Sequence, residues 1–207
     1  YVDKPVAMKE LGRLSRDVAA PELKAETGKQ VAVIGGGPGG LAAAWQLRLL
    51  GHGGTVYEAE EEIGGKLRQV IPTDRLPADS LESEIQRIKD VGIAVKNNTK
   101  VDTELFATIQ KESDAVVIAS GAHNPVIIPF PGHELLTRGL DFLKDVNAGK
   151  NPRVWLQLVE ILHIKAGMDT CLGAYAMGAE KVLAIDIQRP AAYKQEIDGV
   201  KALGGEI

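Results

Sequence analysis

The sequence predicts an α/β protein with a parallel sheet, and three observations support this fold class. Short apolar runs at residues 31–34, 55–58 and 114–119 have the length and composition of strands in a buried sheet. Helical patterns at 41–50 and 77–92 separate these runs. The chain is also rich in glycine, with 23 among 207 residues, as tight turns between strands and helices require. Alternating strands and helices form parallel sheets, which bind ligands at the carboxyl ends of their strands.

Further along the chain, the pattern predicts how these elements are connected. Residues 5–19 have helical spacing, and Pro21 and a polar linker separate them from the first strand. Helix 77–92 leads into a strand at 93–95, and a stretch rich in Pro, Gly and Asn at 147–152 predicts a domain boundary. A strand at 181–186 would belong to the next unit. Because the chain starts at Tyr1 and ends where a strand would begin, we expect a fragment of a longer protein.

Composition limits the possible partners. Hydrophobic residues make up 44% and charged residues 25%, as in globular rather than disordered chains. The formal charge of -4, without a run of Lys or Arg, predicts no nucleic-acid partner. No stretch reaches the ~18 apolar residues of a membrane helix, and no secretory signal opens the chain, so we expect no membrane insertion and a cytoplasmic location. The single cysteine, Cys171, rules out an internal disulfide, a redox cysteine pair or an iron–sulfur cluster held by these residues alone.

The strongest local signal is the motif Gly35-x-Gly37-x-x-Gly40, which follows a predicted strand and opens a predicted helix. In a dinucleotide-binding turn, the first glycine permits the tight turn and the second lets a pyrophosphate approach the backbone. The third lets the helix pack closely on the strand. The phosphates then meet the N–H groups at the helix N-terminus. Glu58 ends the second strand, near the offset of about 20 residues at which an acid binds the ribose hydroxyls.

The residues after Glu58 favour FAD over NAD as the first nucleotide. The loop Ile63-Gly64-Gly65-Lys66-Leu67 follows the ribose acid directly, and a simple NAD-binding dehydrogenase domain does not usually need it. A further turn of small residues, at 119–121, follows the last strand of this sheet. A simple NAD-dependent dehydrogenase is disfavoured by the Gly64-Gly65 pair and by Arg75.

Five segments together resemble the flavoprotein family that includes the small subunit of glutamate synthase, the flavin half of dihydropyrimidine dehydrogenase and related NADH–ferredoxin oxidoreductase subunits. The segments are residues 31–44, Tyr57-Glu58-Ala59, 64–68, Ile71-Pro72-Thr-Asp-Arg75-Leu76-Pro77 and 119–123. The resemblance covers nearly the whole chain, and the run at 71–77 is its most specific part. It implies a Rossmann-type FAD-binding domain with an inserted or following NAD(P)-binding Rossmann-like domain, here truncated. The domains would be 1–29 (N-terminal helix and linker), 30–150 (N-terminal part of the FAD-binding domain) and 151–207 (start of the NAD(P)-binding domain).

The same resemblance implies an FAD-dependent NAD(P)H oxidoreductase that transfers hydride from NAD(P)H to FAD and passes electrons to an iron–sulfur subunit or domain. It assigns no catalytic side chain and no metal ligand. The residues that it places at the FAD pyrophosphate are Gly35, Gly37, Pro38, Gly39, Gly40 and Gly121, with Ala119 and Ser120 beside them. Those that it places elsewhere on FAD are Glu58 and Ala59 at the ribose, Val101 at the adenine, and Gly65, Lys66, Leu67 and Arg75 on the flavin side. Arg75 could instead be a solvated loop charge, and Val101 could be part of the core.

The second nucleotide site departs from the family pattern. After Arg153-Val154 the family pattern has a strand, a glycine triplet and then a helix, which would start at Ala166. Residues 155–165, however, contain no glycine. One hypothesis is a local frameshift in the recorded sequence, because the codons of 154–160, read one nucleotide out of frame, permit Val-Val-Ala-Ile-Gly-Gly-Asn. The alternative is a degenerate site, which would leave a non-catalytic flavin-binding scaffold or electron-conduit subunit. Asp186 would bind the adenosine ribose of NAD, while Arg189 could accommodate the phosphate of NADP.

Overall fold

The computed structural model describes residues 21–124, 137–150, 159–160, 166–180, 182, 184–185 and 194–206. These residues form two compact units. Unit 1 consists of those within Tyr1–Arg68 and Leu76–Gly121, and unit 2 of those within Gln69–Arg75 and Ala122–Ile207. The predicted helix at 5–19 and the predicted ribose acid Asp186 lie outside the described residues.

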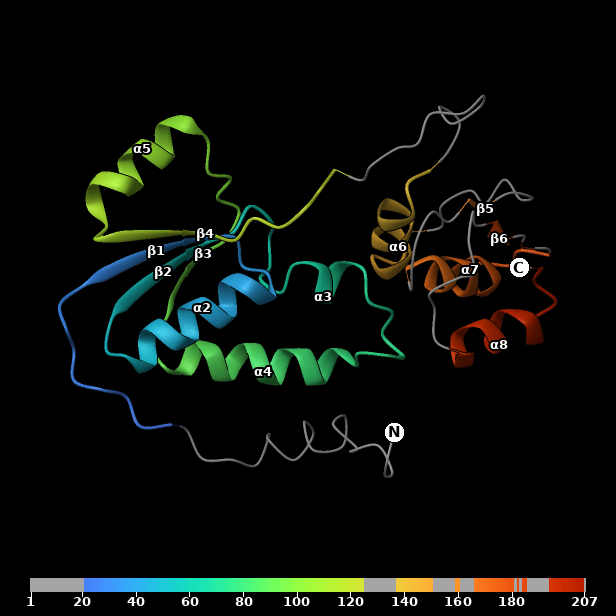
Figure 1. Cartoon of the computed structure of the whole chain (residues 1–207), viewed down its shortest axis with the longest axis horizontal. Helices are drawn as coiled ribbons and strands as arrows, with labels where there is room; N and C mark the ends of the chain where they lie inside the picture. Colours follow the sequence, from blue (N-terminus) through green and yellow to red (C-terminus); the bar gives the residue numbers. More distant parts are fainter. Residues whose placement is uncertain are drawn as a thin grey trace, which may run out of the picture. The chain divides into compact units, whose positions relative to one another are not determined.

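Unit 1 is built on a four-stranded parallel sheet with the order β3-β2-β1-β4 (Figure 1). The central strand β1 pairs with β2 through Val33 and Val56, and with β4 through Val33 and Val117. Figure 1 shows α2 and α4 on one face of this sheet and α5 on the other. The elements are β1 (Gln30–Ile34), α2 (Pro38–Leu49), β2 (Gly53–Tyr57), α3 (Lys66–Gln69), α4 (Ala78–Asp90), β3 (Ala94–Lys96), α5 (Thr103–Glu112) and β4 (Ala115–Ile118).

The core of unit 1 positions helix α2, which follows β1 after the glycine turn. Val33 and Val56, on neighbouring strands, are fully buried and pack with Ala44 of α2 and with Val91 and Ile93. A second cluster consists of Leu41, Ile63, Leu81 and Ile85. The first cluster holds α2 against the sheet, and the second packs the first turn of α2 against Ile63 and α4. Burial of such side chains stabilises the fold by roughly 1.5–3 kcal/mol each.

The predicted strands at 31–34, 55–58 and 114–119 are confirmed as β1, β2 and β4, and the predicted helices at 41–50 and 77–92 as α2 and α4. Helix α2 starts at Pro38, earlier than predicted, because proline is well tolerated in a first helical turn. The helices α3 and α5 of unit 1 were not predicted.

Helix α5 begins at a side-chain cap that is independent of any ligand. Asp102 precedes the helix in an extended conformation, and its Oδ1 accepts a hydrogen bond from the Leu105 N–H at 2.9 Å. We predict that Asp102→Ala lowers the free energy of unfolding by about 1 kcal/mol, because an N–H of the first turn loses its acceptor. Asp102→Asn, which keeps an acceptor oxygen, should lose much less. Urea unfolding of both variants checks this, and equal losses would contradict the capping role.

The described residues of unit 2 form three helices and a pair of parallel strands. These are α6 (Gly139–Asn147), β5 (Val159–Glu160), α7 (Ala166–Ala176), β6 (Ala184–Ile185) and α8 (Lys194–Ala202). Val159 pairs with Ala184 and Glu160 with Ile185, so the described part of segment 155–165 is a strand. The predicted helix from Ala166 is confirmed as α7, whereas α6 and α8 were not predicted. Of the strand predicted at 181–186, the structure describes Ala184–Ile185 as strand.

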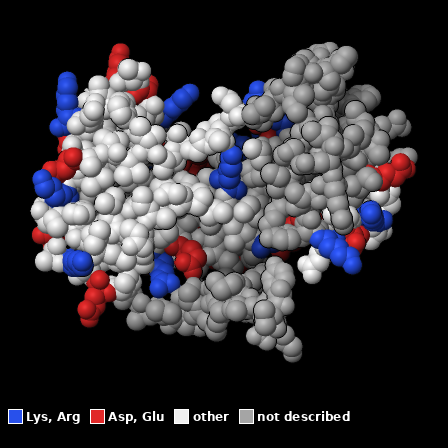
Figure 2. Space-filling model, in the orientation of Figure 1, with Lys and Arg blue, Asp and Glu red and all other residues white. Residues whose placement is uncertain are grey.

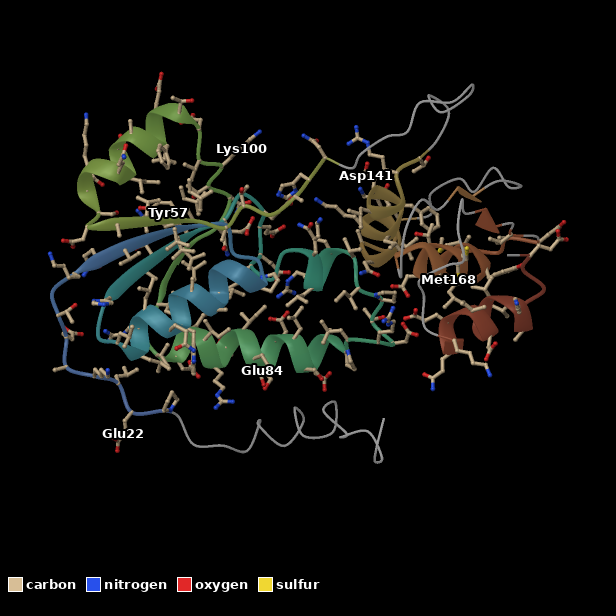
Figure 3. All side chains as sticks on the ribbon, in the orientation of Figure 1. Glu22, Tyr57, Glu84, Lys100, Asp141 and Met168 are labelled. Atoms are coloured by element: carbon tan, nitrogen blue, oxygen red, sulfur yellow. The ribbon has the colours of Figure 1, made fainter. Side chains whose placement is uncertain are left out.

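The core of unit 2 lies between its three helices. Leu143 of α6, Met168 and Cys171 of α7 and Val200 of α8 are buried in it (Figure 3 labels Met168). Cys171 is fully buried, and burial raises the pKa of its thiol to about 11, so the thiol stays protonated near neutral pH. Cys171 is therefore a packed core residue rather than a nucleophile.

The sequence predicts a boundary between ligand-binding domains at residues 150 and 151, whereas the two units divide at Gly121 and separate Gln69–Arg75 from its neighbours. The sequence-based boundary remains a prediction about the intact protein. None of the described helices is long and apolar enough to cross a membrane. In the view of Figure 2, charges of both signs are scattered around the margin of unit 1, and Lys and Arg do not gather into a patch on this face.

Candidate nucleotide-binding site

The candidate site is built on the turn that joins β1 to α2. Gly35 has a φ of 105°, which glycine adopts without strain, and its N–H donates to the carbonyl oxygen of Tyr57 at 2.8 Å. Tyr57 is the last residue of β2 (Figure 3). A Cβ at Gly35 would overlap the carbonyl oxygen of Ala119, on the other side of the turn. Gly35 is thus held between the ends of β2 and β4, and only a glycine fits there.

The remaining glycines of the motif divide into a tight position and open ones. A Cβ at Gly40 would overlap the carbonyl oxygen of Gly35, so this glycine allows α2 to pack against the turn. At Gly37 and Gly39 a Cβ would have no neighbour within 4 Å. Gly37 is the N-cap of α2 and provides no side-chain cap. The first N–H groups of a helix lack carbonyl partners within the helix, so this open end can receive an anion.

Glu58 lies directly after β2 and is buried, with 8% of its surface exposed. Its Oε2 accepts a hydrogen bond from the N–H of Gly36 at 2.7 Å, and its Oε1 accepts one from the N–H of Glu60 at 2.9 Å. A carboxylate oxygen can accept more than one hydrogen bond, so each oxygen retains capacity for a ligand hydroxyl. The carboxylate is therefore fixed beside the glycine turn in a position defined by two backbone donors.

The second glycine loop packs against the first. The N–H of Gly64 donates to the carbonyl oxygen of Gly36 at 2.8 Å, and a Cβ at Gly65 would lie 2.9 Å from the Cα of Gly37. Both Gly64 and Gly65 have positive φ angles, of 124° and 52°. Ile63 is buried beneath Gly36, where an added Cβ would lie 2.6 Å from its Cγ2. The two loops therefore pack together as one structure, and α3 begins directly after them with Lys66 and Leu67.

Arg68 anchors this second loop, although sequence reasoning did not select it. Its Nε donates to the carbonyl oxygen of Ile63 at 3.0 Å, and its Nη1 lies 2.5 Å from Glu82 and 3.0 Å from Glu62. Gly36 and Ile63 were also missed as site residues. The run of three glycines is a signal for Gly36, because a side chain there would collide with both Ile63 and Glu58.

The last part of the candidate site comes from β4 and the segment before α5. The Ala119 N–H donates to the carbonyl oxygen of Ile34 at 2.8 Å, which continues the pairing of β4 with β1. Ser120 and Gly121 follow it, and Gly121 has a φ of 77°. Thr99 donates to the carbonyl oxygen of Glu58 at 2.7 Å and so attaches the segment that leads to the half-buried Val101.

The structure thus brings together most of the predicted cofactor-binding residues of unit 1 around one turn. The backbones of Gly35, Gly37, Gly40, Gly65 and Ala119 meet there, together with the side-chain carboxylate of Glu58. Pro38 and Gly39 lie in the first turn of α2, and Ala59 is exposed next to Glu58. Arg75 belongs instead to unit 2, where it contacts two acids. Their roles toward FAD remain predictions.

The glycine turn, the buried acid and the parallel sheet lie in the part of the chain that matches a known family. Residues 29–159, more than half of the chain, match the pyridine nucleotide-disulphide oxidoreductase family. The chain belongs to this family.

Individual relatives agree with this family. The chain is 36% identical over 162 residues to the NADP(+)-dependent formate dehydrogenase subunit beta of Moorella thermoacetica, covering 75% of this chain and 23% of that protein. It is 38% identical over 124 residues to the glutamate synthase (NADPH) small chain of Mycobacterium tuberculosis, covering 58% and 25%. The resemblance to glutamate synthase small subunits is therefore confirmed. The chain spans about a quarter of the length of these two relatives.

A solved structure supports the Rossmann-type fold. The chain superposes on a 2-naphthoyl-CoA reductase with a TM-score of 0.71 at 22% identity, covering 92% of this chain and 29% of that one. At this level of identity the likeness is one of fold. Together with the parallel order β3-β2-β1-β4, it identifies unit 1 as a Rossmann-like α/β domain.

Proposed function

We propose that this chain binds FAD at the turn between β1 and α2, and that it belongs to an FAD-dependent NAD(P)H oxidoreductase. One observation carries the proposal. The open backbone of Gly37 at the N-terminus of α2 lies next to the Gly36 amide, which holds the buried Glu58 carboxylate at 2.7 Å. A diphosphate requires the first feature, and the ribose beside it requires the second.

The residues of unit 1 fit FAD in their chemistry. The helix N-terminus supplies N–H donors and a positive dipole for the pyrophosphate, and Glu58 supplies acceptors for ribose hydroxyls. On the family resemblance, Val101 would line the adenine, and Gly65, Lys66 and Leu67 would lie toward the flavin. When bound, FAD supplies the hydride and electron chemistry, while the protein binds and orients it. None of its side chains is assigned to donate or accept a proton.

The partner and the second nucleotide are proposed on the same basis. The formate dehydrogenase and glutamate synthase relatives are named as a subunit and a small chain, which supports a place in a larger complex. We propose that an iron–sulfur subunit or domain accepts the electrons. NADH or NADPH would bind in the domain that begins in unit 2, with Asp186 at its ribose. A cytoplasmic location accords with this redox role.

The experiment is an anaerobic titration of the purified chain. We predict that it copurifies with FAD or binds added FAD, and that the flavin absorbance bleaches on addition of NADH or NADPH. A chain that binds no FAD would overturn the proposal. The reduced nicotinamide that bleaches the flavin at the lower concentration identifies the physiological donor.

A second function is favoured by one feature of the sequence. Residues 155–165 contain no glycine, although the family pattern has a glycine triplet at this point. A scaffold or electron-conduit subunit would bind FAD but would have lost the nicotinamide site. In the same titration, bound FAD that neither NADH nor NADPH bleaches supports this function. Resequencing the codons of 154–160 separates a true loss from a frameshift in the recorded sequence.

A further inference from the structure

The seven-residue segment Gln69–Arg75, which we call the strap, lies in the sequence between two segments of unit 1. Arg68 and Leu76, on either side of the strap, belong to unit 1, whereas the strap itself belongs to unit 2. Side-chain packing, a hydrogen bond and an ion-pair cluster hold it there. The family resemblance places Arg75 near the flavin, whereas the contacts described below indicate a different role for it.

The first two attachments involve the start of the strap. Val70 packs against the buried cluster formed by α6, α7 and α8. Asn147, the last residue of α6, donates from Nδ2 to the carbonyl oxygen of Ile71 at 2.9 Å. The strap then turns, and the Arg75 N–H donates to the carbonyl oxygen of Pro72 at 3.0 Å. This turn directs the side chain of Arg75 toward the N-terminal turns of two helices.

The third attachment is a guanidinium held between two carboxylates. Nη1 of Arg75 lies 2.5 Å from Oδ1 and 2.7 Å from Oδ2 of Asp169, in the first turn of α7. Nη2 lies 3.1 Å from Oε1 of Glu196, in the first turn of α8. The side chains of both acids are only 12% exposed, and that of Arg75 is 36% exposed. A rigid, planar fork of donors can satisfy two acids at once, which a lysine ammonium cannot do with the same geometry.

The charges explain why the arginine matters more than an ordinary surface ion pair. Burial raises the pKa of the Asp169 carboxyl, Arg75 lowers it, and the nearby Glu196 and Asp74 raise it further. Burial alone lowers the pKa of Arg75, but Asp169, Glu196 and Asp74 together raise it above its ordinary value. Both pKa shifts include contributions from Glu196 and Asp74, so Arg75 interacts with more than one acid in a partly buried place. The contact of Nη1 with both carboxylate oxygens requires an ionised Asp169, so loss of the guanidinium would remove the cation that Asp169 and Glu196 share.

We propose that Arg75 is a positioning residue that bridges the N-terminal turns of α7 and α8 and thereby locks the strap into unit 2. In this role it acts through Asp169 and Glu196 and not as a contact to FAD. The strap is therefore part of unit 2, although it lies in the sequence between two segments of unit 1, and the packing of α7 with α8 depends on it. This inference does not require FAD to bind.

The test is hydrogen–deuterium exchange of the full chain, with amides of residues 69–76 and of the first turn of α7 as the readout. Arg75→Met and Asp169→Asn should each accelerate exchange in the strap about tenfold, which corresponds to the loss of one charged hydrogen bond. The double variant should be little faster than either single variant, because both remove the same contact. Arg75→Lys should restore part of the protection. Arg138→Met is the matched control, since the ion pair of Arg138 with Asp141 in the described part of unit 2 is 3.9 Å long and both side chains are at least half exposed.

The outcomes distinguish the positioning role of Arg75 from a contact between Arg75 and the flavin. The positioning role is refuted if the strap amides exchange no faster in Arg75→Met than in Arg138→Met. It is also refuted if the effects of Arg75→Met and Asp169→Asn on the exchange rate are additive in the double variant. A loss of bound FAD or a shifted flavin absorbance in Arg75→Met, with the strap still protected, would assign Arg75 to the flavin instead. If Arg75→Met does not fold, Asp169→Asn and Glu196→Gln test the same contacts from the acid side. A chain that binds no FAD but loses strap protection in these variants would refute only the proposed function.

Discussion

Gly37→Ala is expected to abolish most FAD binding while leaving the fold of unit 1 nearly intact. Gly37 has a φ of -76°, which alanine adopts freely, and a Cβ there would have no neighbour within 4 Å. The loss of stability should therefore stay near or below about 1 kcal/mol, the usual difference between glycine and alanine at an N-cap. The added methyl group would occupy the space through which a pyrophosphate reaches the backbone. We expect FAD affinity to fall about a hundredfold, which corresponds to one or two charged hydrogen bonds.

Gly40→Ala, in contrast, is expected to lower the stability of unit 1 strongly. Its Cβ would overlap the carbonyl oxygen of Gly35 and lie 3.2 Å from Cγ1 of Val33, so backbone atoms must move. The expected loss is about 3 kcal/mol, typical of severe overpacking. This exceeds the roughly 1 kcal/mol that alanine gains over glycine inside a helix. FAD binding should be lost together with stability.

Gly39→Ala is the matched control for stability, because it makes the same change in the same helical turn without meeting any neighbour within 4 Å. Urea unfolding and quenching of flavin fluorescence measure the two properties separately. Unimpaired FAD binding by Gly37→Ala would show that the pyrophosphate does not approach this turn. A Gly40→Ala variant as stable as Gly39→Ala would show that the turn can relax.

The glycine turn could be predicted because its signals are local. An apolar strand, three spaced glycines and an acid at the end of the next strand lie within a few dozen residues, and each has one physical reason for its place. The close approach of Gly40 to the Gly35 carbonyl oxygen and the buried carboxylate of Glu58 are the structural counterparts of these signals.

Two helices outside the sequence-based prediction carry helical patterns of their own. Helix α5 carries Leu105, Phe106 and Ile109 at helical spacing after the capping residue Asp102, a pattern that was available in the sequence. Helix α6 carries Phe142, Leu143 and Val146 next to the stretch of 147–152, whose composition instead suggested a domain boundary. A polar, glycine-rich connection indicates a loop, but it does not reveal whether the helix before it packs with the preceding or the following elements.

The strap could not have been predicted from residues 69–75 alone. Arg75 and Asp169 are separated by 94 positions in the sequence, and no local pattern specifies that an arginine in a loop pairs with an acid in a distant helix. Such contacts are set by tertiary packing, here by Val70 in the core of unit 2 and by Asn147 on the strap backbone. The sequence motif identified Arg75 as an unusual residue, and only the structure supplies its partners.

Glu58→Ala is expected to impair both FAD binding and stability, for a different reason from the glycine variants. The carboxylate accepts hydrogen bonds from the N–H groups of Gly36 and Glu60 at 2.7 and 2.9 Å. Gly36 is buried, so its N–H would lose its acceptor without gaining water, whereas the exposed Glu60 can be solvated. We expect a loss of about 2–3 kcal/mol, the range for a hydrogen bond to a charged group together with an unsatisfied buried donor. FAD affinity should fall at least tenfold, because the ribose hydroxyls lose their acceptor.

Glu58→Gln refines this prediction, because the amide has the same shape but only one acceptor oxygen. That oxygen can serve one of the two N–H groups, and the amide NH2 must then face the other donor. We therefore expect Glu58→Gln to lose more than half of the stability lost by Glu58→Ala, although it leaves no cavity. Glu61→Ala, which removes an exposed acid three residues away, is the control and should change stability by less than about 0.5 kcal/mol. If Glu58→Gln were as stable as the unsubstituted chain and bound FAD equally well, the carboxylate would be acting only by its volume, and the ribose would have to be held by other residues.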